Sequence, residues 1–228
     1  LVGSEMCIRD RKLVIQLPDQ VEGYVLRTLV FESAETLKPV FFNVPRDQTL
    51  PLRDISTPLT VYLVSDSICQ YYQQSDYPQE GWGQNIGQFF QEGVTIDNRA
   101  MGGRSTKSFI SEGRWDGENG ILKTLKPGDY VLLSMGHNDR NTAAAEKYTT
   151  IAEYQSYLER YIDDTARAGA SIILITPPTE MWGHGNSLEE RSGAMREVAV
   201  KKGVPLLDLN AVSYKPVSYT HLRAHETL

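Results

Sequence analysis

The sequence predicts an α/β fold built on a five-stranded parallel sheet, and two observations support this prediction. From Thr60 onward, apolar and β-branched runs alternate with segments long enough for helices. Turn residues separate them: Lys126-Pro127-Gly128-Asp129 leads into the central run. Strands that alternate with helices imply a parallel sheet with right-handed crossovers. We expect strands at 61–65, 94–97, 129–135, 170–176 and 204–208, and helices at 82–92, 104–111, 151–168 and 187–202.

The third of these helices shows which of its faces is buried. Tyr154, Tyr157, Leu158, Tyr161 and Ile162 recur at helical spacing, which predicts that they face the sheet as core residues. The last helix is expected to end at a glycine, because Gly203 and then Pro205 bracket the return to the final strand.

The region before this domain has a different pattern. In residues 12–58, segments 12–17 and 24–31 alternate apolar and polar residues, segment 39–44 is a short apolar stretch, and turn residues separate the three. This pattern predicts a partial β-sandwich-like accessory segment of short antiparallel strands. Residues 1–11 and 218–228 show no periodicity and resemble translated library-adapter sequence, so we expect both ends to be artefactual. The domain of interest would then cover residues 59–217 and be incomplete at its C-terminus.

Composition excludes several classes of protein. The 228 residues are 40% hydrophobic and 23% charged, as is usual for a globular protein. A net charge of −6 argues against a nucleic-acid partner and suits an anionic membrane surface poorly. No apolar run approaches the roughly 18 residues needed to span a bilayer, and no signal peptide is visible. The two cysteines and four scattered histidines form no metal-binding spacing, so we expect no metal or other cofactor.

Three short motifs follow the first three expected strands, at the sheet edge where α/β proteins bind ligands. Ser67 lies on the turn after the first strand, where its hydroxyl and backbone N–H are exposed; alone it could equally cap a helix or turn. Gly102 and Gly103 allow close backbone approach or a simple tight turn. Asn138 could donate to an oxyanion, whereas His137 could simply anchor its turn. Together the motifs suggest acyl-transfer chemistry.

These motifs resemble the first three sequence blocks of the SGNH (GDSL-type) hydrolase superfamily, namely SDS at 65–67, the glycine at 103 and GHND at 136–139. Within it, NRAMGGRSTKSF at 98–109 and SMGHND at 134–139 are most similar to bacterial rhamnogalacturonan acetylesterases. The resemblance implies a three-layer flavodoxin-like fold and removal of O-acetyl groups from pectic polysaccharide, or from a small ester. It implies Ser67 as nucleophile, with its own N–H, the Gly103 N–H and the Asn138 amide as the oxyanion hole. It also implies a secreted or periplasmic enzyme.

The sequence departs from the family pattern at two points. Ser65 stands where the first block usually has glycine, which predicts a slightly altered turn. More seriously, the family takes its general base from an Asp-x-x-His motif after the last strand, and no Asp-x-x-His occurs in these 228 residues. Asp208, at a strand end, is expected to be structural. Because a serine without a base is a poor nucleophile, we expect this polypeptide to be nearly inactive.

Two other readings stay open. A non-catalytic carbohydrate-binding protein could hold sugar rings against Trp82, Trp115 and Trp182. An SGNH scaffold could also act on another acyl group, such as a lipid, a thioester or xylan acetate, because fold alone does not decide the substrate.

Overall fold

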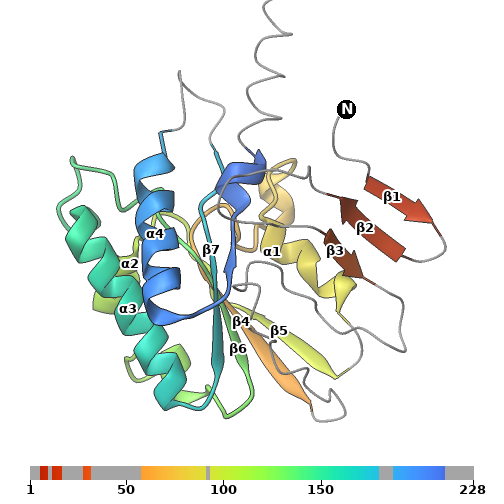
Figure 1. Cartoon of the computed structure of the whole chain (residues 1–228), viewed down its shortest axis with the longest axis horizontal. Helices are drawn as coiled ribbons and strands as arrows, with labels where there is room; N and C mark the ends of the chain where they lie inside the picture. The colour runs from red at the N-terminus through yellow and green to blue at the C-terminus, as the bar shows by residue number, and fades with distance from the viewer. Residues whose placement is uncertain are drawn as a thin grey trace, which may run out of the picture.

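The computed structural model describes residues 58–90, 93–179 and 187–213, together with the backbone of three short strands nearer the N-terminus. Its centre is a parallel sheet with the strand order β5-β4-β6-β7-β8 (Figure 1). Counted from β4, this is the flavodoxin-like order 2-1-3-4-5. The five predicted strands are all confirmed: β4 (Leu59–Ser65), β5 (Val94–Asn98), β6 (Tyr130–Ser134), β7 (Ser171–Ile175) and β8 (Leu206–Leu207).

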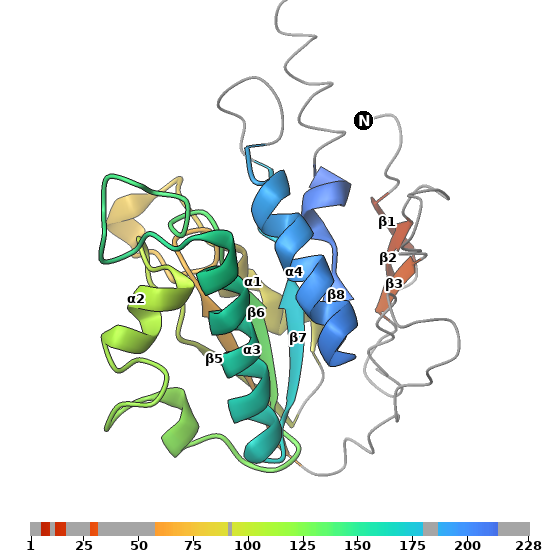
Figure 2. The same ribbon diagram turned by 60° about the vertical axis from the view of Figure 1, so that its left-hand side comes forward.

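Helices cover both faces of the sheet, which gives the three layers expected (Figures 1 and 2). One face carries α2 (Thr106–Ser111), α3 (Ile151–Arg167) and α4 (Glu189–Lys202). The other face carries α1 (Trp82–Asn85), the 3-10 turn Ile86–Phe89 and the helical residues 209–213. Two further 3-10 turns, Gln74–Asp76 and Ile121–Lys123, lie in the loops after β4 and before β6.

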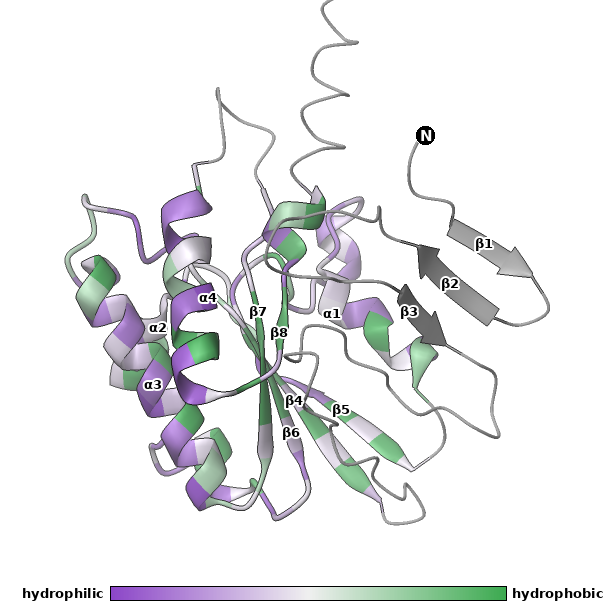
Figure 3. Ribbon diagram, viewed as in Figure 1, coloured by the Kyte–Doolittle hydropathy of each residue, from purple (hydrophilic) through white to green (hydrophobic). Residues whose placement is uncertain are grey.

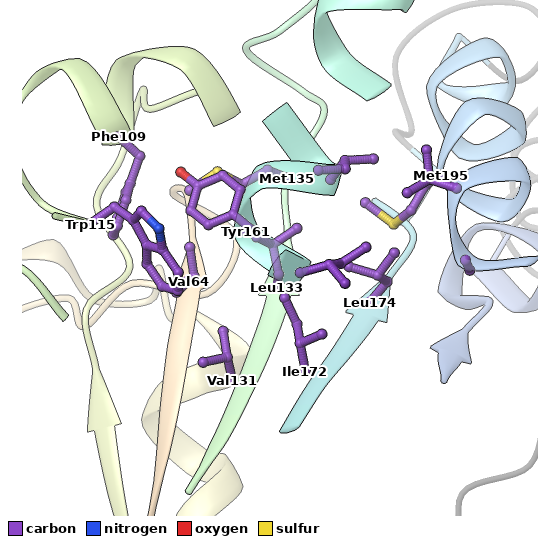
Figure 4. Packing of buried hydrophobic residues seen from close by; sticks show 14 of the residues in the cluster. Val64, Phe109, Trp115, Val131, Leu133, Met135, Tyr161, Ile172, Leu174 and Met195 are labelled. Carbon is purple, nitrogen blue, oxygen red and sulfur yellow. The ribbon is translucent and has the colours of Figure 1, made fainter. Parts of the chain in front are cut away.

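The main core lies between the sheet and the α2–α3–α4 layer. The central strands are strongly apolar (Figure 3), because helices cover them on both sides. Trp115 and Tyr161 meet edge to face at 4.7 Å between ring centroids, beside Phe109 and Met135 (Figure 4). The predicted inner face of α3 is confirmed, with Tyr154, Leu158, Tyr161 and Ile162 buried and Tyr157 partly buried against them.

The predicted helix at 82–92 is wrong in its length. The chain makes one α turn, continues as a 3-10 turn and leaves helical geometry at Phe90. Gly83 explains the close packing at its start, because a Cβ there would lie 2.4 Å from the Cys69 carbonyl oxygen. Gly83 and Gly87 also lower helix propensity. The segment therefore follows the surface of the β4–β5 layer rather than forming a long helix.

The other turn predictions are confirmed. Gly203 ends α4 in the left-handed region, with φ of 65°. The turn before β6 closes through the Asp129 N–H, which donates to the Lys126 carbonyl oxygen at 3.0 Å, with Gly128 at φ of 87°.

Three short antiparallel strands lie nearer the N-terminus: β1 (Met6–Arg9), β2 (Lys12–Gln16) and β3 (Thr28–Phe31). The strands β2 and β3 fall inside two predicted segments, and the third segment, 39–44, lies outside the described residues. Strand β1 falls where the pattern predicts no element; its ladder with β2 is made by backbone groups, which require no side-chain periodicity. The assignment of these regions as accessory or artefactual stays a prediction.

Two kinds of feature are absent from the described residues. No helix in these ranges is both long and apolar enough to cross a bilayer. In the same ranges no group of three or more His, Cys, Asp or Glu side chains could hold a metal ion.

Candidate active site

The three predicted site residues lie on loops that leave the same edge of the sheet. Ser67 follows β4, Gly103 follows β5 and Asn138 follows β6; β4 is the middle strand of these three. We name the loops the Ser67 loop (66–70), the Gly103 loop (99–105) and the Asn138 loop (135–139). The strand order reverses at β4, and in open α/β sheets ligands generally bind at such a point.

Backbone hydrogen bonds join the Ser67 loop to the Gly103 loop. The Met101 N–H donates to the Ser65 carbonyl oxygen at 3.0 Å. The Gly102 N–H donates to Oε1 of Gln70 at 2.5 Å, so the Gln70 side chain holds the glycine pair directly. Gln70 is a residue that the motif did not indicate, because its role depends on a contact with a loop 32 residues later.

The Asn138 side chain links all three loops. Its Nδ2 donates to the Arg104 carbonyl oxygen at 3.0 Å and lies 3.3 Å from Oδ2 of Asp66. Arg104 is the chain neighbour of Gly103, and Asp66 is the chain neighbour of Ser67. The structure therefore brings the three predicted residues into one cluster, with the Asn138 amide at its centre.

Ser67 and Gly103 keep donors that no acceptor in the described part of the protein uses. Within the described part of the chain, the Ser67 hydroxyl makes no hydrogen bond, and neither do the backbone N–H groups of Ser67 and Gly103. The Ser67 loop is nevertheless fixed, because the Tyr72 hydroxyl donates to the Ser67 carbonyl oxygen at 2.9 Å. Gly103 adopts φ of +76°, where a side chain would be strained.

The Asp139 side chain joins the Asn138 loop to the start of α2, directly after the Gly103 loop. Its carboxylate accepts from the Thr106 N–H, at 3.2 Å to each oxygen, and from the Thr106 hydroxyl at 2.5 Å. Thr149 donates to it at 3.2 Å. Burial raises the pKa of Asp139 to about 6, against the lowering effect of these hydrogen bonds and of the nearby Arg191 charge. Asp139 therefore holds the start of α2 rather than capping a helix of its own.

Two tyrosines of α3 donate hydrogen bonds to the Asn138 loop and to the first residue of α2. The Tyr154 hydroxyl donates to the Met135 carbonyl oxygen at 2.7 Å, and the Tyr161 hydroxyl donates to the Thr106 carbonyl oxygen at 3.0 Å. Both tyrosines are fully buried. Burial raises the pKa of each phenol well above its usual value, so both remain neutral donors.

His137 and Ser65 serve structural roles. His137 Nε2 lies 3.2 Å from the Pro178 carbonyl oxygen, and its Nδ1 lies 3.6 Å from Oδ2 of Asp66. These contacts fit the expected role of anchoring the turn. The Ser65 hydroxyl donates to the Ser134 carbonyl oxygen at 2.5 Å across the strands, which accommodates a side chain where the family usually has glycine.

Asp208 is held in a structural network, as predicted. Its Oδ1 accepts from the Thr176 hydroxyl at 2.9 Å and from Arg196 Nη2 at 3.1 Å, while its Oδ2 accepts from Arg196 Nε at 2.8 Å. This carboxylate fixes α4 against the end of β7. The histidines at 184, 221 and 225 lie outside the described residues.

Of the three tryptophans, Trp115 is not available to stack on a sugar ring. Trp115 is fully buried, and its indole N–H donates to Asp164 at 2.8 Å, so the reading that it stacks on a sugar is wrong. Trp82 is partly buried against the α1 side of the sheet, and Trp182 lies outside the described residues.

Two curated proteins are similar to this chain in sequence. YesY of Bacillus subtilis (strain 168), a probable rhamnogalacturonan acetylesterase, is 38% identical over 154 residues, which are 65% of this chain and 69% of YesY. RhgT, a rhamnogalacturonan acetylesterase of the same organism, is 35% identical over 159 residues, 68% of this chain and 66% of RhgT.

Solved structures show the same fold. The crystal structure of YxiM from Bacillus subtilis superposes with a TM-score of 0.60 at 27% identity and covers 85% of this chain, which in turn spans 55% of that chain. The acetylxylan esterase Axe2 from Geobacillus stearothermophilus superposes with a TM-score of 0.51 at 17% identity, over 69% of this chain and 78% of that one. Residues 66–227 match the model of the GDSL-like lipase/acylhydrolase family. With its strand order, its three loops and its relatives in agreement, the chain belongs to this family of carboxylic ester hydrolases.

Proposed function

We propose that this chain carries the acyl-transfer site of an esterase that removes O-acetyl groups from carbohydrate, specifically from pectic rhamnogalacturonan. The observation that carries the proposal is the Ser67 hydroxyl, which makes no hydrogen bond in the described part of the chain and lies in one cluster with Gly103 and Asn138. The substrate class rests on the names of YesY and RhgT. Such a polymer lies outside the cell, so we propose secretion or a periplasmic location.

The reaction proposed is a two-step acyl transfer. The Ser67 oxygen attacks the acetyl carbonyl carbon while a base takes the hydroxyl proton, and the sugar oxygen leaves with a proton. The acetyl group is then bonded to Ser67 until water hydrolyses that ester and releases acetate. In each step the Ser67 N–H, the Gly103 N–H and the Asn138 amide would donate to the negative oxygen of the tetrahedral intermediate.

Asn138 must exchange one contact to play this part. Its shorter hydrogen bond, to Arg104, fixes the amide plane. Its longer contact, to Asp66, is the weaker of the two and is the one that an oxyanion would replace. The amide would therefore keep its bond to Arg104, and its second N–H would donate to the substrate oxygen in place of Asp66.

The general base is the part that this chain does not supply. No Asp-x-x-His occurs in the sequence, and the single histidine among the described residues, His137, is held between Asp66 and Pro178. Loss of the base alone lowers turnover by about 10⁶-fold in a comparable serine hydrolase. We therefore propose that the polypeptide as it stands binds its substrate but turns it over very slowly.

Imidazole can stand in for the absent base, and this gives a direct test. Acetate release from an acetylated rhamnogalacturonan oligosaccharide is measured with and without added imidazole. We expect release that rises with imidazole in the natural protein and in Ser111→Ala, an exposed serine outside the cluster, and that is absent in Ser67→Ala. Equal release from Ser67→Ala and the natural protein would disprove the nucleophile assignment. Release from an acetylated xylo-oligosaccharide alone would disprove the pectic substrate.

A further inference from the structure

We propose that Lys147 is a substrate-binding residue whose ammonium group binds a carboxylate on the sugar chain next to the acetyl group. The inference rests on the proposed function and adds to it a group that recognises a uronic acid. Nothing in the motifs points to Lys147, which lies 44 residues after Gly103 in the sequence.

Position is the first argument. A Cβ added to Gly103 would have Lys147 Nζ as its nearest neighbour, at 3.6 Å. Standard backbone dimensions then place the ammonium no more than about 6 Å from the Gly103 nitrogen. A substituent on the sugar ring that carries the acetyl group, or on the adjoining ring, can span this distance. The ammonium therefore stands beside the proposed oxyanion hole.

The second argument is that this charge has no partner. Among the described residues, Lys147 Nζ makes no hydrogen bond and no ion pair. The other cations of this region are already engaged: Arg104 pairs with Glu112 at 2.9 Å, Arg99 pairs with Asp97 at 2.8 Å, and Lys107 donates to the Ala145 carbonyl oxygen at 2.7 Å. A partly buried, unpaired ammonium is ready to receive an anion from outside.

The third argument is that the backbone fixes this lysine in place. The Lys147 N–H donates to the Ala144 carbonyl oxygen at 2.9 Å, and the Tyr148 N–H donates to the same oxygen at 2.8 Å. The Thr149 N–H then donates to the Asp139 carbonyl oxygen at 2.9 Å, which returns the loop to the Asn138 loop. Because the loop is closed on itself, its lysine meets a ligand with little backbone entropy to lose.

The negative net charge of the chain makes the position of the Lys147 cation important for binding an acidic ligand. The chain carries a net charge of −6, so an acidic polysaccharide is repelled by the protein as a whole. A local cation beside the reacting group would offset that repulsion at the one point where contact is needed. A hydrogen bond between an ammonium and a carboxylate is also stronger than one between neutral groups.

The test compares two ligands that differ only in charge. One is an acetylated rhamnogalacturonan oligosaccharide, and the other is the same oligosaccharide with its carboxylates reduced to primary alcohols. Affinities for the full chain are measured by calorimetry at low salt. We expect the natural protein to bind the acidic ligand at least about 10-fold more tightly, Lys147→Gln to bind both ligands equally, and Lys147→Arg to retain the preference.

Lys123→Gln is the matched control. Lys123 is exposed, makes no ion pair among the described residues and lies in the loop before β6, at the opposite end of that strand from Asn138. It should keep the full preference, although it loses the same charge. A preference that survives in Lys147→Gln, or a natural protein that binds both ligands equally or neither, would overturn the inference. So would a Lys147→Gln variant whose only defect is weaker binding of free acetate, since that would make Lys147 a product site.

These outcomes are separate from those of the imidazole experiment. A charge preference that depends on Lys147, in a protein that releases no acetate through Ser67, would leave the binding site intact and refute the esterase. Acetate release through Ser67 with no charge preference would support the esterase and refute the role of Lys147.

Discussion

Replacement of Asp139 by asparagine should change how the stability of this protein depends on pH. Asp139 is fully buried, and its pKa rises from 3.8 to about 6 because burial disfavours the charged form. A raised pKa means that the folded protein holds this proton more tightly than the unfolded chain does. The stabilisation is therefore complete below pH 3.8 and is lost as the pH rises through 6.

The size of the effect follows from the same values. At about 1.4 kcal/mol per pH unit, a pKa of about 6 in place of 3.8 corresponds to about 3 kcal/mol. Asparagine keeps an oxygen that can accept from Thr106 but does not ionise. The stability of the natural protein relative to Asp139→Asn should therefore fall by about 2.5 kcal/mol between pH 4 and pH 7, because part of the effect is already lost at pH 4.

Urea unfolding of both proteins across this pH range measures the difference, and groups that they share cancel. Asp163→Asn is the control, because Asp163 is half exposed and pairs with Lys202 at the surface, at 2.6 Å. Its difference from the natural protein should change by less than about 1 kcal/mol. A difference for Asp139→Asn that stays constant, or that grows in favour of the natural protein as pH rises, would refute the reasoning.

Two further substitutions test the packing around the site, each by urea unfolding. Gly136→Ala should destabilise by about 3 kcal/mol or more, since φ is +150° and a Cβ would lie 2.9 Å from Pro177 Cγ. Gly193→Ala, with nothing within 4 Å inside α4, should stabilise by about 0.5–1 kcal/mol, and shifts of the same sign for the two alanines would contradict this account. Leu174→Ala, fully buried in the core, should lose about 2–5 kcal/mol, whereas Val200→Ala on the exposed side of α4 should change stability by less than about 1 kcal/mol; equal losses would show the core assignment to be wrong.

The sheet could be predicted from the sequence because its central strands, β4, β6 and β7, are buried on both faces. Runs such as Val131–Leu133 within β6 are apolar throughout, and that signal is independent of what packs on them. The helix at 82–92 is predicted too long because the length of the segment is given more weight than Gly83 and Gly87, which lower helix propensity. Motif and strand position together placed Ser67, Gly103 and Asn138 at one edge.

The rest of the site depends on contacts between distant segments. Asp139 reaches Thr106 across 33 residues, and Gln70 reaches Gly102 across 32. The Lys147 ammonium lies near Gly103 only because the intervening loop folds back on the Asn138 loop. Neither hydrophobic periodicity nor motif spacing indicates contacts between such distant segments, so these residues can be identified only from the folded structure.

The two tyrosine hydroxyls of α3 have a consequence for how the backbone at this edge of the sheet can move. Tyr154 and Tyr161 are seven residues apart on one helix, a rise of about 10 Å. Tyr154 donates to a carbonyl of the Asn138 loop, and Tyr161 donates to the carbonyl of the first residue of α2, which follows the Gly103 loop. The helix therefore fixes the distance between the two carbonyl groups. Neither carbonyl can shift relative to the other unless α3 bends or one of the buried phenol hydrogen bonds breaks. Among the described residues no hydrogen bond from α3 reaches the Ser67 loop, so a small shift of that loop would leave both phenol contacts intact.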